Sequence, residues 1–235
     1  MIYCLKMMEL LGKNFKKYLN YSLNLIYPLK CLICQKDMEP TLPAGLCSDC
    51  FNKIQKYSSS PKILPEHKYY FKQIWAACPY EGVIKEAIHL LKYKGKLILV
   101  NQLSSVMIAY AKENLPLADI DFLIPVPLHR SRLKEREFNQ SEILASKLAN
   151  YFFLSLLNNV LIRIRPTPPQ TNLSKEERFN SLKGAFALKK KGLIKGKNIL
   201  LIDDVFTTGA TANQCAKVLI ENKANEVSVF TLAKG

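Results

Sequence analysis

Hydrophobic and polar positions change their pattern near residue 70. Beyond this point, short apolar runs bounded by turn residues alternate with stretches in which apolar residues recur every three to four positions. The first pattern is typical of buried strands and the second of amphipathic helices. We expect strands at 73–80, 121–128, 158–165, 198–203 and 226–233, and helices at 83–95, 97–115, 138–152 and 211–223.

The alternation of strands and helices predicts the fold class. Apolar strands separated by helices favour an α/β protein, in which helices cover both faces of a parallel sheet. Ligands of such sheets gather at the carboxyl ends of the strands. Long irregular segments at 125–137 and 164–184 follow two of the strands, and segments of that kind in a compact domain are usually functional.

The chain before residue 70 is organised differently. Residues 1–27 carry an amphipathic pattern, with Leu5 and Met8 at helical spacing and lysines between the apolar positions. Such a stripe either rests on a membrane surface or docks on its own protein, and docking is the more common case. We expect three parts, namely an amphipathic segment at 1–27, a four-cysteine module at 28–60 and the α/β domain at 70–235.

Four of the seven cysteines form two pairs, Cys31 with Cys34 and Cys47 with Cys50, in the pattern C-x2-C-x12-C-x2-C. Two residues between thiolates let both sulfurs turn toward one point, and two such pairs complete the tetrahedral sulfur shell that Zn²⁺ prefers. The alternatives are disulfides, free thiols or an iron–sulfur cluster, which usually uses other spacings. Because the N-terminus has no secretory-signal pattern, a reducing compartment disfavours disulfides. We therefore predict a structural zinc site.

Charge distinguishes the chain from an average soluble protein. Lys+Arg number 34 against 19 Asp+Glu, so the formal net charge is +15, and the excess is spread along the chain. Hydrophobic residues make up 49%, which fits a folded protein and not a disordered one. The charge favours nucleic acid, phosphorylated small molecules or anionic lipid as partners. No run of 18 apolar residues occurs, so we expect a cytoplasmic protein, with peripheral contact at the inner membrane left open.

An acidic and then uncharged stretch, "LLIDDVFTTGAT", stands out against this positive charge at 200–211. Asp203 and Asp204 end an apolar strand, and a turn leads into a helix. The turn consists of Thr207, Thr208, Gly209, Ala210 and Thr211. Such a turn offers backbone N–H groups, hydroxyls and a helix N-terminus to an anion. The carboxylates would repel phosphate, so we expect them to face sugar hydroxyls or a Mg²⁺ shell. Helix capping alone would explain one Asp and one Thr, not two of each.

This stretch resembles the phosphoribosyl pyrophosphate (PRPP) motif of the type I phosphoribosyltransferases. Further blocks at 80–95, 125–149 and 167–186, behind a four-cysteine module, are similar to the ComF/GntX family. The resemblance covers residues 25–235. It implies a type I phosphoribosyltransferase-like parallel sheet flanked by helices, with a small N-terminal zinc ribbon.

The resemblance also implies roles for the matching residues. Asp203 and Asp204 would bind the ribose hydroxyls, and Thr207 to Thr211 would hold the 5-phosphate. The loop after the strand at 121–128 would take the pyrophosphate, with His129, Arg130, Arg132 and Arg136 nearby. The 163–184 segment would cover the ligand with Arg163, Arg165, Gln170 and Arg178. Mg²⁺ would accompany PRPP. No general base is evident, and the candidates for catalytic residues are Arg136, Arg165 and Arg178.

Two functions follow from this resemblance. ComF relatives are associated with natural competence, so the first is a PRPP-binding protein that handles single-stranded DNA during uptake, beside the uptake machinery at the inner membrane face. The second is an active phosphoribosyltransferase that transfers phosphoribosyl from PRPP to an acceptor and releases pyrophosphate; the sequence does not identify the acceptor or the oligomeric state. The aromatics suit base stacking or the core, and the core is favoured. They are Tyr69, Tyr70, Phe71 and Trp75.

One residue departs from the family pattern. The family block runs Arg-Gly-Phe-Asn-Gln, whereas this chain has Glu137 at the glycine position. If that glycine serves a positive φ, Glu137 must strain or reshape the loop. A carboxylate there would also repel pyrophosphate, which bears on turnover more than on PRPP binding.

Overall fold

The computed structural model describes residues 29–39, 44–58, 69–166, 177, 181–190 and 192–235. The chain divides into two compact units, one extending to Lys53 and the other spanning Ile54–Gly235. The amphipathic segment expected at 1–27 lies outside the described residues, as do Gln170 and Arg178. None of the helices in the described part of the chain is long and apolar enough to cross a membrane.

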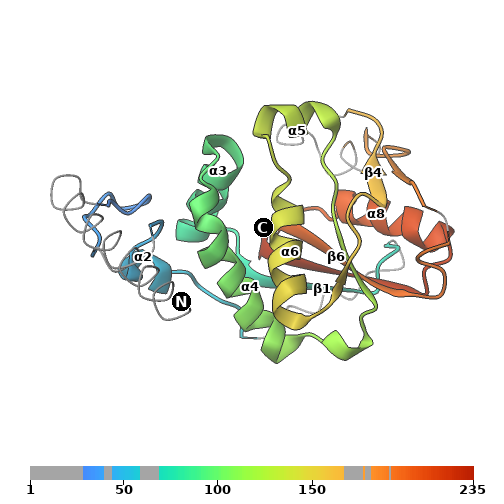
Figure 1. Ribbon diagram of the computed structural model, residues 1–235, viewed down its shortest axis with the longest axis horizontal. Helices are drawn as coiled ribbons and strands as arrows, with labels where there is room; N and C mark the ends of the chain where they lie inside the picture. Colours follow the sequence, from blue (N-terminus) through green and yellow to red (C-terminus); the bar gives the residue numbers. More distant parts are fainter. Residues whose placement is uncertain (1–28, 40–43, 59–68, 167–176, 178–180, 191) are drawn as a thin grey trace, which may run out of the picture. The chain divides into compact units, whose positions relative to one another are not determined.

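The larger unit is built on a five-stranded sheet in the order β1-β7-β6-β2-β3, in which every neighbouring pair is parallel (Figure 1). The strands are β1 (Gln73–Pro79), β2 (Phe122–Pro125), β3 (Ser155–Leu156), β6 (Asn198–Phe206) and β7 (Glu226–Lys234). The central strand β6 begins with an apolar run that is buried from Ile199 to Ile202. Such a run is what a strand covered on both faces requires.

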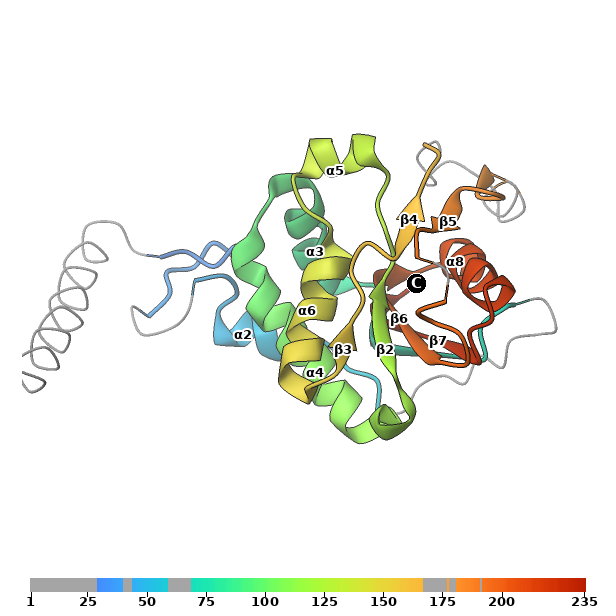
Figure 2. The same ribbon diagram turned by 45° about the vertical axis from the view of Figure 1, so that its right-hand side comes forward.

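Helices cover both faces of this sheet. The helices of the larger unit are α3 (Gly82–Lys94), α4 (Val100–Asn114), α5 (Arg130–Arg136), α6 (Gln140–Phe152) and α8 (Ala210–Glu221), with short 3₁₀ turns η1 (Leu97–Leu99) and η2 (Leu117–Asp119). α4 and α6 pack on one face and α8 on the other (Figures 1 and 2). The parallel α/β sheet flanked by helices, predicted from the hydrophobic pattern, is confirmed.

Two details differ from the sequence prediction. The segment 158–165, expected as a strand of the main sheet, instead contains β4 (Leu161–Arg163), which pairs antiparallel with β5 (Phe186–Leu188) in a separate two-stranded sheet. A turn in which Asn159 adopts a left-handed conformation, φ 59°, redirects the chain after β3. An apolar run shows that a strand forms but not with which strand it pairs. The 125–137 segment, expected as an irregular loop, contains α5.

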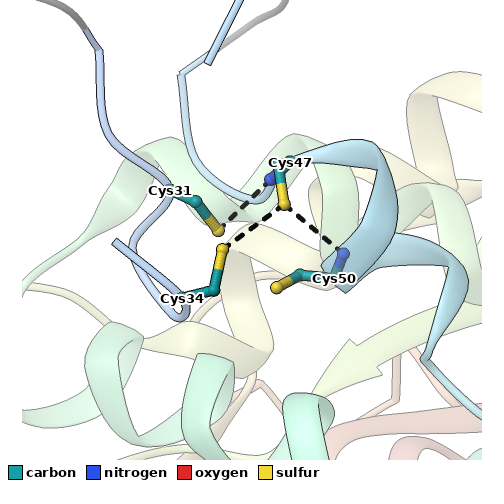
Figure 3. A group of neighbouring side chains, drawn as sticks. All are labelled: Cys31, Cys34, Cys47 and Cys50. Carbon is teal, nitrogen blue, oxygen red and sulfur yellow. Dashed lines mark hydrogen bonds between the residues drawn. The ribbon is translucent and has the colours of Figure 1, made fainter. Parts of the chain in front are cut away.

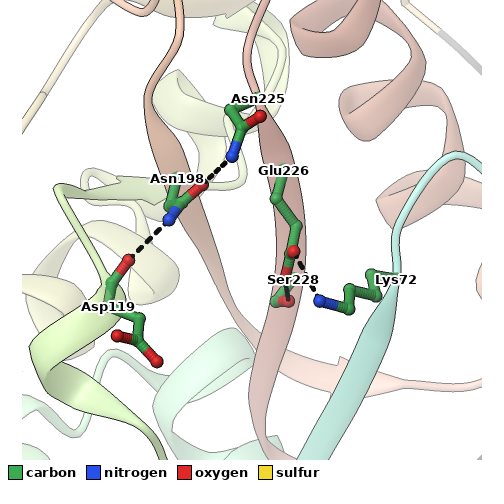
Figure 4. A network of polar contacts seen from close by, with 6 residues as sticks. All are labelled: Lys72, Asp119, Asn198, Asn225, Glu226 and Ser228. Carbon is green, nitrogen blue, oxygen red and sulfur yellow. Dashed lines mark hydrogen bonds and ion pairs between the residues drawn. The ribbon is translucent and has the colours of Figure 1, made fainter.

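Polar contacts fix the amino ends of the strands, opposite the acidic end of β6. The Asn198 side-chain amide donates to the Asp119 carbonyl at 2.9 Å, and Asn225 donates to Asn198 at 2.7 Å (Figure 4). Beside them, Lys72 pairs with Glu226 at 2.7 Å. These contacts hold the start of β6 beside the start of β7, so their carboxyl ends lie in register at the other edge of the sheet.

Candidate functional site

A cavity of about 310 Å³ lies at the carboxyl ends of β2 and β6. Side chains from most of the surrounding elements line it. From α3, α5, α6, α8, the strand ends and the loops that follow them come Tyr80, Lys92, Tyr93, Val126, Pro127, Leu128, Arg132, Arg136, Gln140, Ser141, Arg163, Asp203, Asp204, Val205, Thr207 and Thr211. The position is the one at which parallel sheets bind ligands.

The two aspartates at the end of β6 are held in different ways. Asp203 Oδ1 accepts hydrogen bonds from the Ser141 hydroxyl at 2.8 Å and from the Asp204 N–H at 2.9 Å. Asp204 Oδ2 forms an ion pair with Lys92 Nζ at 2.6 Å, in which the Asp204 side chain is only 8% exposed. Burial raises the pKa of Asp203 to about 7, and the neighbouring charge of Asp204 adds to the rise. Only Asp204 has a cationic partner at close range in the described chain.

The threonine loop follows directly and begins α8. Gly209 has φ 76°, and a Cβ placed there would lie 2.6 Å from the Phe206 ring. This position therefore requires glycine for both its backbone conformation and its close approach to Phe206. A second, smaller cavity of about 50 Å³ lies inside this turn, lined by residues 205–212, Asp203 and Thr231. Thr207 and Thr211 border both cavities, so the loop and the acid pair face one connected region.

Three arginines form the basic wall of the larger cavity. Arg132 and Arg136 come from α5, four residues apart and therefore on one face of the helix, and Arg163 comes from β4. Burial and the charge of nearby Arg132 lower the pKa of Arg163. The Arg136 guanidinium lies 5.0 Å from the centre of the Tyr93 ring. Several positive charges therefore surround one polar cavity, and a bound polyanion would reduce the repulsion between them.

Other predicted site residues lie elsewhere. His129 caps α5, where its side chain accepts from the Ser131 N–H at 3.2 Å, and Arg130 is exposed. Neither of these two described residues lines the larger cavity. The Arg165 guanidinium donates to the backbone carbonyls of Ser181 and Lys183 at 3.2 and 2.6 Å. Arg165 thus links the end of β4 to the residues that precede β5.

The structure resolves the question that Glu137 raises. Glu137 ends α5 in the left-handed region at φ 67°, so this position does adopt the positive φ for which the family glycine is suited. Its side chain is exposed and borders a different hollow, with Leu133 and Phe138. Glu137 therefore carries backbone strain but does not line the cavity that holds the acid pair.

The residues of the cavity that sequence reasoning missed include Lys92, Gln140 and Ser141. Lys92 continues the row formed by Ile84 and Ile88 at four-residue spacing, which is the buried face of α3. The sequence did contain a sign of this role, since Lys92 lies in line with two buried isoleucines and a charged residue on an apolar helix face needs a partner. For Gln140 and Ser141, which begin α6, no signal in a single sequence distinguishes them from helix-start residues.

The smaller unit contains the four paired cysteines. Cys31 and Cys34 lie in a turn closed by a bridge between Lys30 and Asp37, and Cys47 and Cys50 lie at the start of α2 (Ser48–Asn52). Their sulfurs all lie within 4.8 Å of one another (Figure 3). The sulfurs of Cys34 and Cys47 are 3.7 Å apart. A tetrahedral ion with zinc–sulfur bonds of about 2.3 Å would hold its sulfurs about 3.8 Å apart, so the donor set fits zinc.

Hydrogen bonds to sulfur prepare this cluster for a cation. The Cys47 N–H donates to Cys31 Sγ at 3.3 Å, and the Cys50 N–H donates to Cys47 Sγ at 3.5 Å. Burial would raise the pKa of Cys31, but backbone N–H groups, that of Cys47 first, lower it to about 6. Burial and the neighbouring thiols raise the pKa of Cys50 to about 12. Four adjacent sulfurs cannot all ionise without a compensating positive charge, and a dication bound at their centre would supply it.

The aromatics weighed for base stacking are mainly internal. Phe71 is 1% exposed and Trp75 is 5% exposed, as the core interpretation predicts. Tyr69 donates from its hydroxyl to the Thr208 carbonyl at 3.4 Å and so supports the threonine loop. Tyr70 alone of the four is substantially exposed.

Fold and site together define an α/β protein with an acid pair and an uncharged threonine turn at the strand ends, in a basic cavity. Comparison with known proteins gives the family. The chain is 35% identical over 206 residues to competence protein ComFC of Bacillus subtilis, covering 86% of this chain and 78% of that protein. It is 27% identical over 225 residues to competence protein F of Haemophilus influenzae, covering 88% and 98%. The chain belongs to the ComF family of competence proteins.

Other comparisons add context. The DNA utilization protein YhgH of Escherichia coli K12 is 29% identical over 167 residues, covering 70% of this chain and 73% of that protein. A hypoxanthine phosphoribosyltransferase of Staphylococcus aureus is similar in structure, with 16% identity, a TM-score of 0.39, and coverage of 57% of this chain and 64% of the other. No protein-family model matches the chain.

Proposed function

We propose that this chain binds PRPP in the cavity at the ends of β2 and β6, and that it handles single-stranded DNA during natural transformation. The observation that carries the proposal is the meeting of an acid pair, a threonine loop and three arginines in one cavity. Support for a competence role comes from family membership, since relatives bear the names competence protein F, competence protein ComFC and DNA utilization protein.

The chemistry of PRPP suits the three parts of this cavity. The acid pair would accept hydrogen bonds from the vicinal ribose hydroxyls, which carry no charge. The loop that includes Thr207 and Thr211 would hold the 5-phosphate with backbone N–H groups at the start of α8. Arg132, Arg136 and Arg163 would neutralise the pyrophosphate, together with Mg²⁺ that arrives bound to it.

Two buried donors support an oxygen-rich ligand. Arg136 Nε and Gln140 Nε2 are buried, and neither has a hydrogen-bond partner within the part of the chain that the structure describes. Gln140 is only 2% exposed and lines the cavity. A buried donor without an acceptor costs about 1–3 kcal/mol, and a ligand that supplies acceptor oxygens recovers it.

Isothermal titration calorimetry with Mg²⁺–PRPP tests the proposal. We expect saturable heat for the full chain and its loss in the double variant Asp203→Asn with Asp204→Asn. Asp119→Asn is the matched control, because Asp119 has an exposed side chain at the opposite, amino-terminal edge of the sheet. Unchanged affinity for PRPP in the double variant would show that the acid pair is not part of the PRPP site.

The DNA surface we propose is the outer face of α5. This helix carries four basic residues at two-residue spacing, so they divide between two faces. Arg132 and Arg136 line the cavity, whereas Arg130 and Lys134 are exposed to solvent. The exposed pair, with the net charge of +15, gives a backbone-directed contact for single-stranded DNA beside the PRPP cavity.

Fluorescence anisotropy with a labelled oligothymidylate at several salt concentrations tests this surface. We expect affinity to fall with salt, by about 0.7 log units per log unit of salt for each phosphate neutralised. Arg130→Ala with Lys134→Ala should reduce that slope by about 1.4. The control is Lys189→Ala with Lys190→Ala, an equally charged exposed pair beyond β5. Equal slopes in the two double variants would move the DNA contact away from α5.

A further inference from the structure

In the described part of the chain, Lys92 is the only basic residue of the cavity wall that forms an ion pair with an aspartate of the acid pair. It reaches Asp204 from α3, far from the motif in sequence, and its side chain is 18% exposed. The ammonium lies 2.6 Å from Asp204 Oδ2. The ion pair with Asp204 outweighs the effect of burial, which by itself would lower the pKa of Lys92, and raises it. Lys92 is therefore charged.

The second aspartate is held by neutral donors. Asp203 Oδ1 accepts from the Ser141 hydroxyl and from the Asp204 N–H. Helices α3 and α6 thus each provide one side chain to the acid pair, an ammonium for Asp204 and a hydroxyl for Asp203. The hydroxyl contact to Asp203 shows the kind of partner, an O–H group, that this carboxyl accepts.

This arrangement does not fit a Mg²⁺ ion at the acid pair. Mg²⁺ requires near-octahedral oxygen ligands at about 2.0–2.1 Å. With Nζ 2.6 Å from Asp204 Oδ2, a dication on the same carboxylate would lie within a few ångströms of the ammonium and be repelled by it. The cation that neutralises Asp204 is already part of the protein.

We propose that Lys92 is the resident counter-ion of the acid pair, so that the pair recognises uncharged sugar hydroxyls and does not bind a divalent cation. This rests on the proposed binding of PRPP. A carboxylate oxygen accepts more than one hydrogen bond, so the ion pair leaves acceptor positions for a ribose hydroxyl. Lys92 thereby determines the specificity of the site, and any Mg²⁺ enters bound to the pyrophosphate of the ligand.

The first test uses Mn²⁺, which reports divalent binding by electron paramagnetic resonance, without any sugar phosphate. We expect the wild-type chain to have no Mn²⁺ site at the acid pair, so that Asp204→Asn leaves Mn²⁺ binding unchanged. Lys92→Met should create one, with an affinity at least tenfold higher than that of the wild type, and Asp204→Asn should abolish it again. Lys92→Arg keeps the charge and should resemble the wild type. Lys94→Met, an exposed lysine on the same helix, is the matched control.

The second test needs no Lys92 variant, and so it holds even if Lys92→Met fails to fold. Ribose 5-phosphate lacks the pyrophosphate, and we expect its calorimetric affinity to change less than twofold between Mg²⁺ and EDTA. A requirement for Mg²⁺, or a wild-type Mn²⁺ site lost in Asp204→Asn, would overturn the role of Lys92. If neither PRPP nor ribose 5-phosphate binds, the proposed function is wrong. The Mn²⁺ titration would then still test whether Lys92 prevents divalent binding at Asp204.

Discussion

Replacing Gly209 with alanine tests whether the threonine loop is held as tightly as the structure indicates. The residue has φ 76°, where an L-residue costs about 1–2 kcal/mol. The new Cβ would also lie 2.6 Å from the edge of the Phe206 ring, well inside the usual carbon–carbon contact of about 3.5–4.0 Å. Overpacking of this kind costs about 1–3 kcal/mol. Gly209→Ala should therefore lower the free energy of unfolding by about 2–5 kcal/mol in total.

The ring has little room to move aside. Phe206 is 6% exposed and packs edge-on against Phe71, with ring centres 6.1 Å apart. The loop backbone must shift instead, and because this backbone borders the smaller cavity, we expect weaker PRPP binding as well. If the loop backbone shifts and removes the clash, the free energy of unfolding will stay closer to that of the wild type. The shift would still displace the backbone N–H groups of the threonine loop.

Gly95→Ala is the matched control, since Gly95 has φ 60° at the end of α3 but nothing within 4 Å of the added Cβ. It should lose only the backbone contribution, about 1 kcal/mol, and bind PRPP normally. Urea denaturation followed by circular dichroism measures both variants. If Gly209→Ala is no more destabilising than Gly95→Ala and binds PRPP equally well, the close approach to Phe206 is not a constraint on the loop.

Three further predictions concern the metal, the acid pair and Glu137. Zinc measured by mass spectrometry should fall from one per chain in Cys34→Ser, whereas Cys78→Ser, a buried cysteine of β1, should keep it; retained zinc in Cys34→Ser would refute the cluster. The pKa of Asp203 rises from 3.8 to about 7 on folding, so the folded state holds the extra proton and stability from this group is lost as pH rises through that window. Urea titrations should therefore show wild type losing about 3 kcal/mol more than Asp203→Asn between pH 5 and pH 8, and parallel pH profiles would contradict this. Glu137→Gly should raise the unfolding free energy by about 1 kcal/mol, because φ 67° suits glycine; a loss of stability would show that the glutamate side chain compensates for the strain.

The sequence was most informative where local pattern and chemistry coincide. The apolar runs predicted the central strands, and the spacing of four cysteines predicted a cluster that the structure brings within metal-binding distance. It was least informative about strand pairing. Leu161–Arg163 pairs with Phe186–Leu188 and not with the main sheet, and the apolar run that predicted the strand does not specify this partner.

The site divides in the same way between sequence and tertiary structure. The sequence by itself determined the acid pair and the threonine turn, because these features are contiguous and their geometry is local. Only the tertiary structure decided which side chains face them. Lys92 and Ser141 reach the acid pair from positions 111 and 62 residues before Asp203 in the chain, through the packing of α3 and α6. Long-range packing sets such distances, and for that reason the counter-ion of Asp204 was not visible in the motif that contains it.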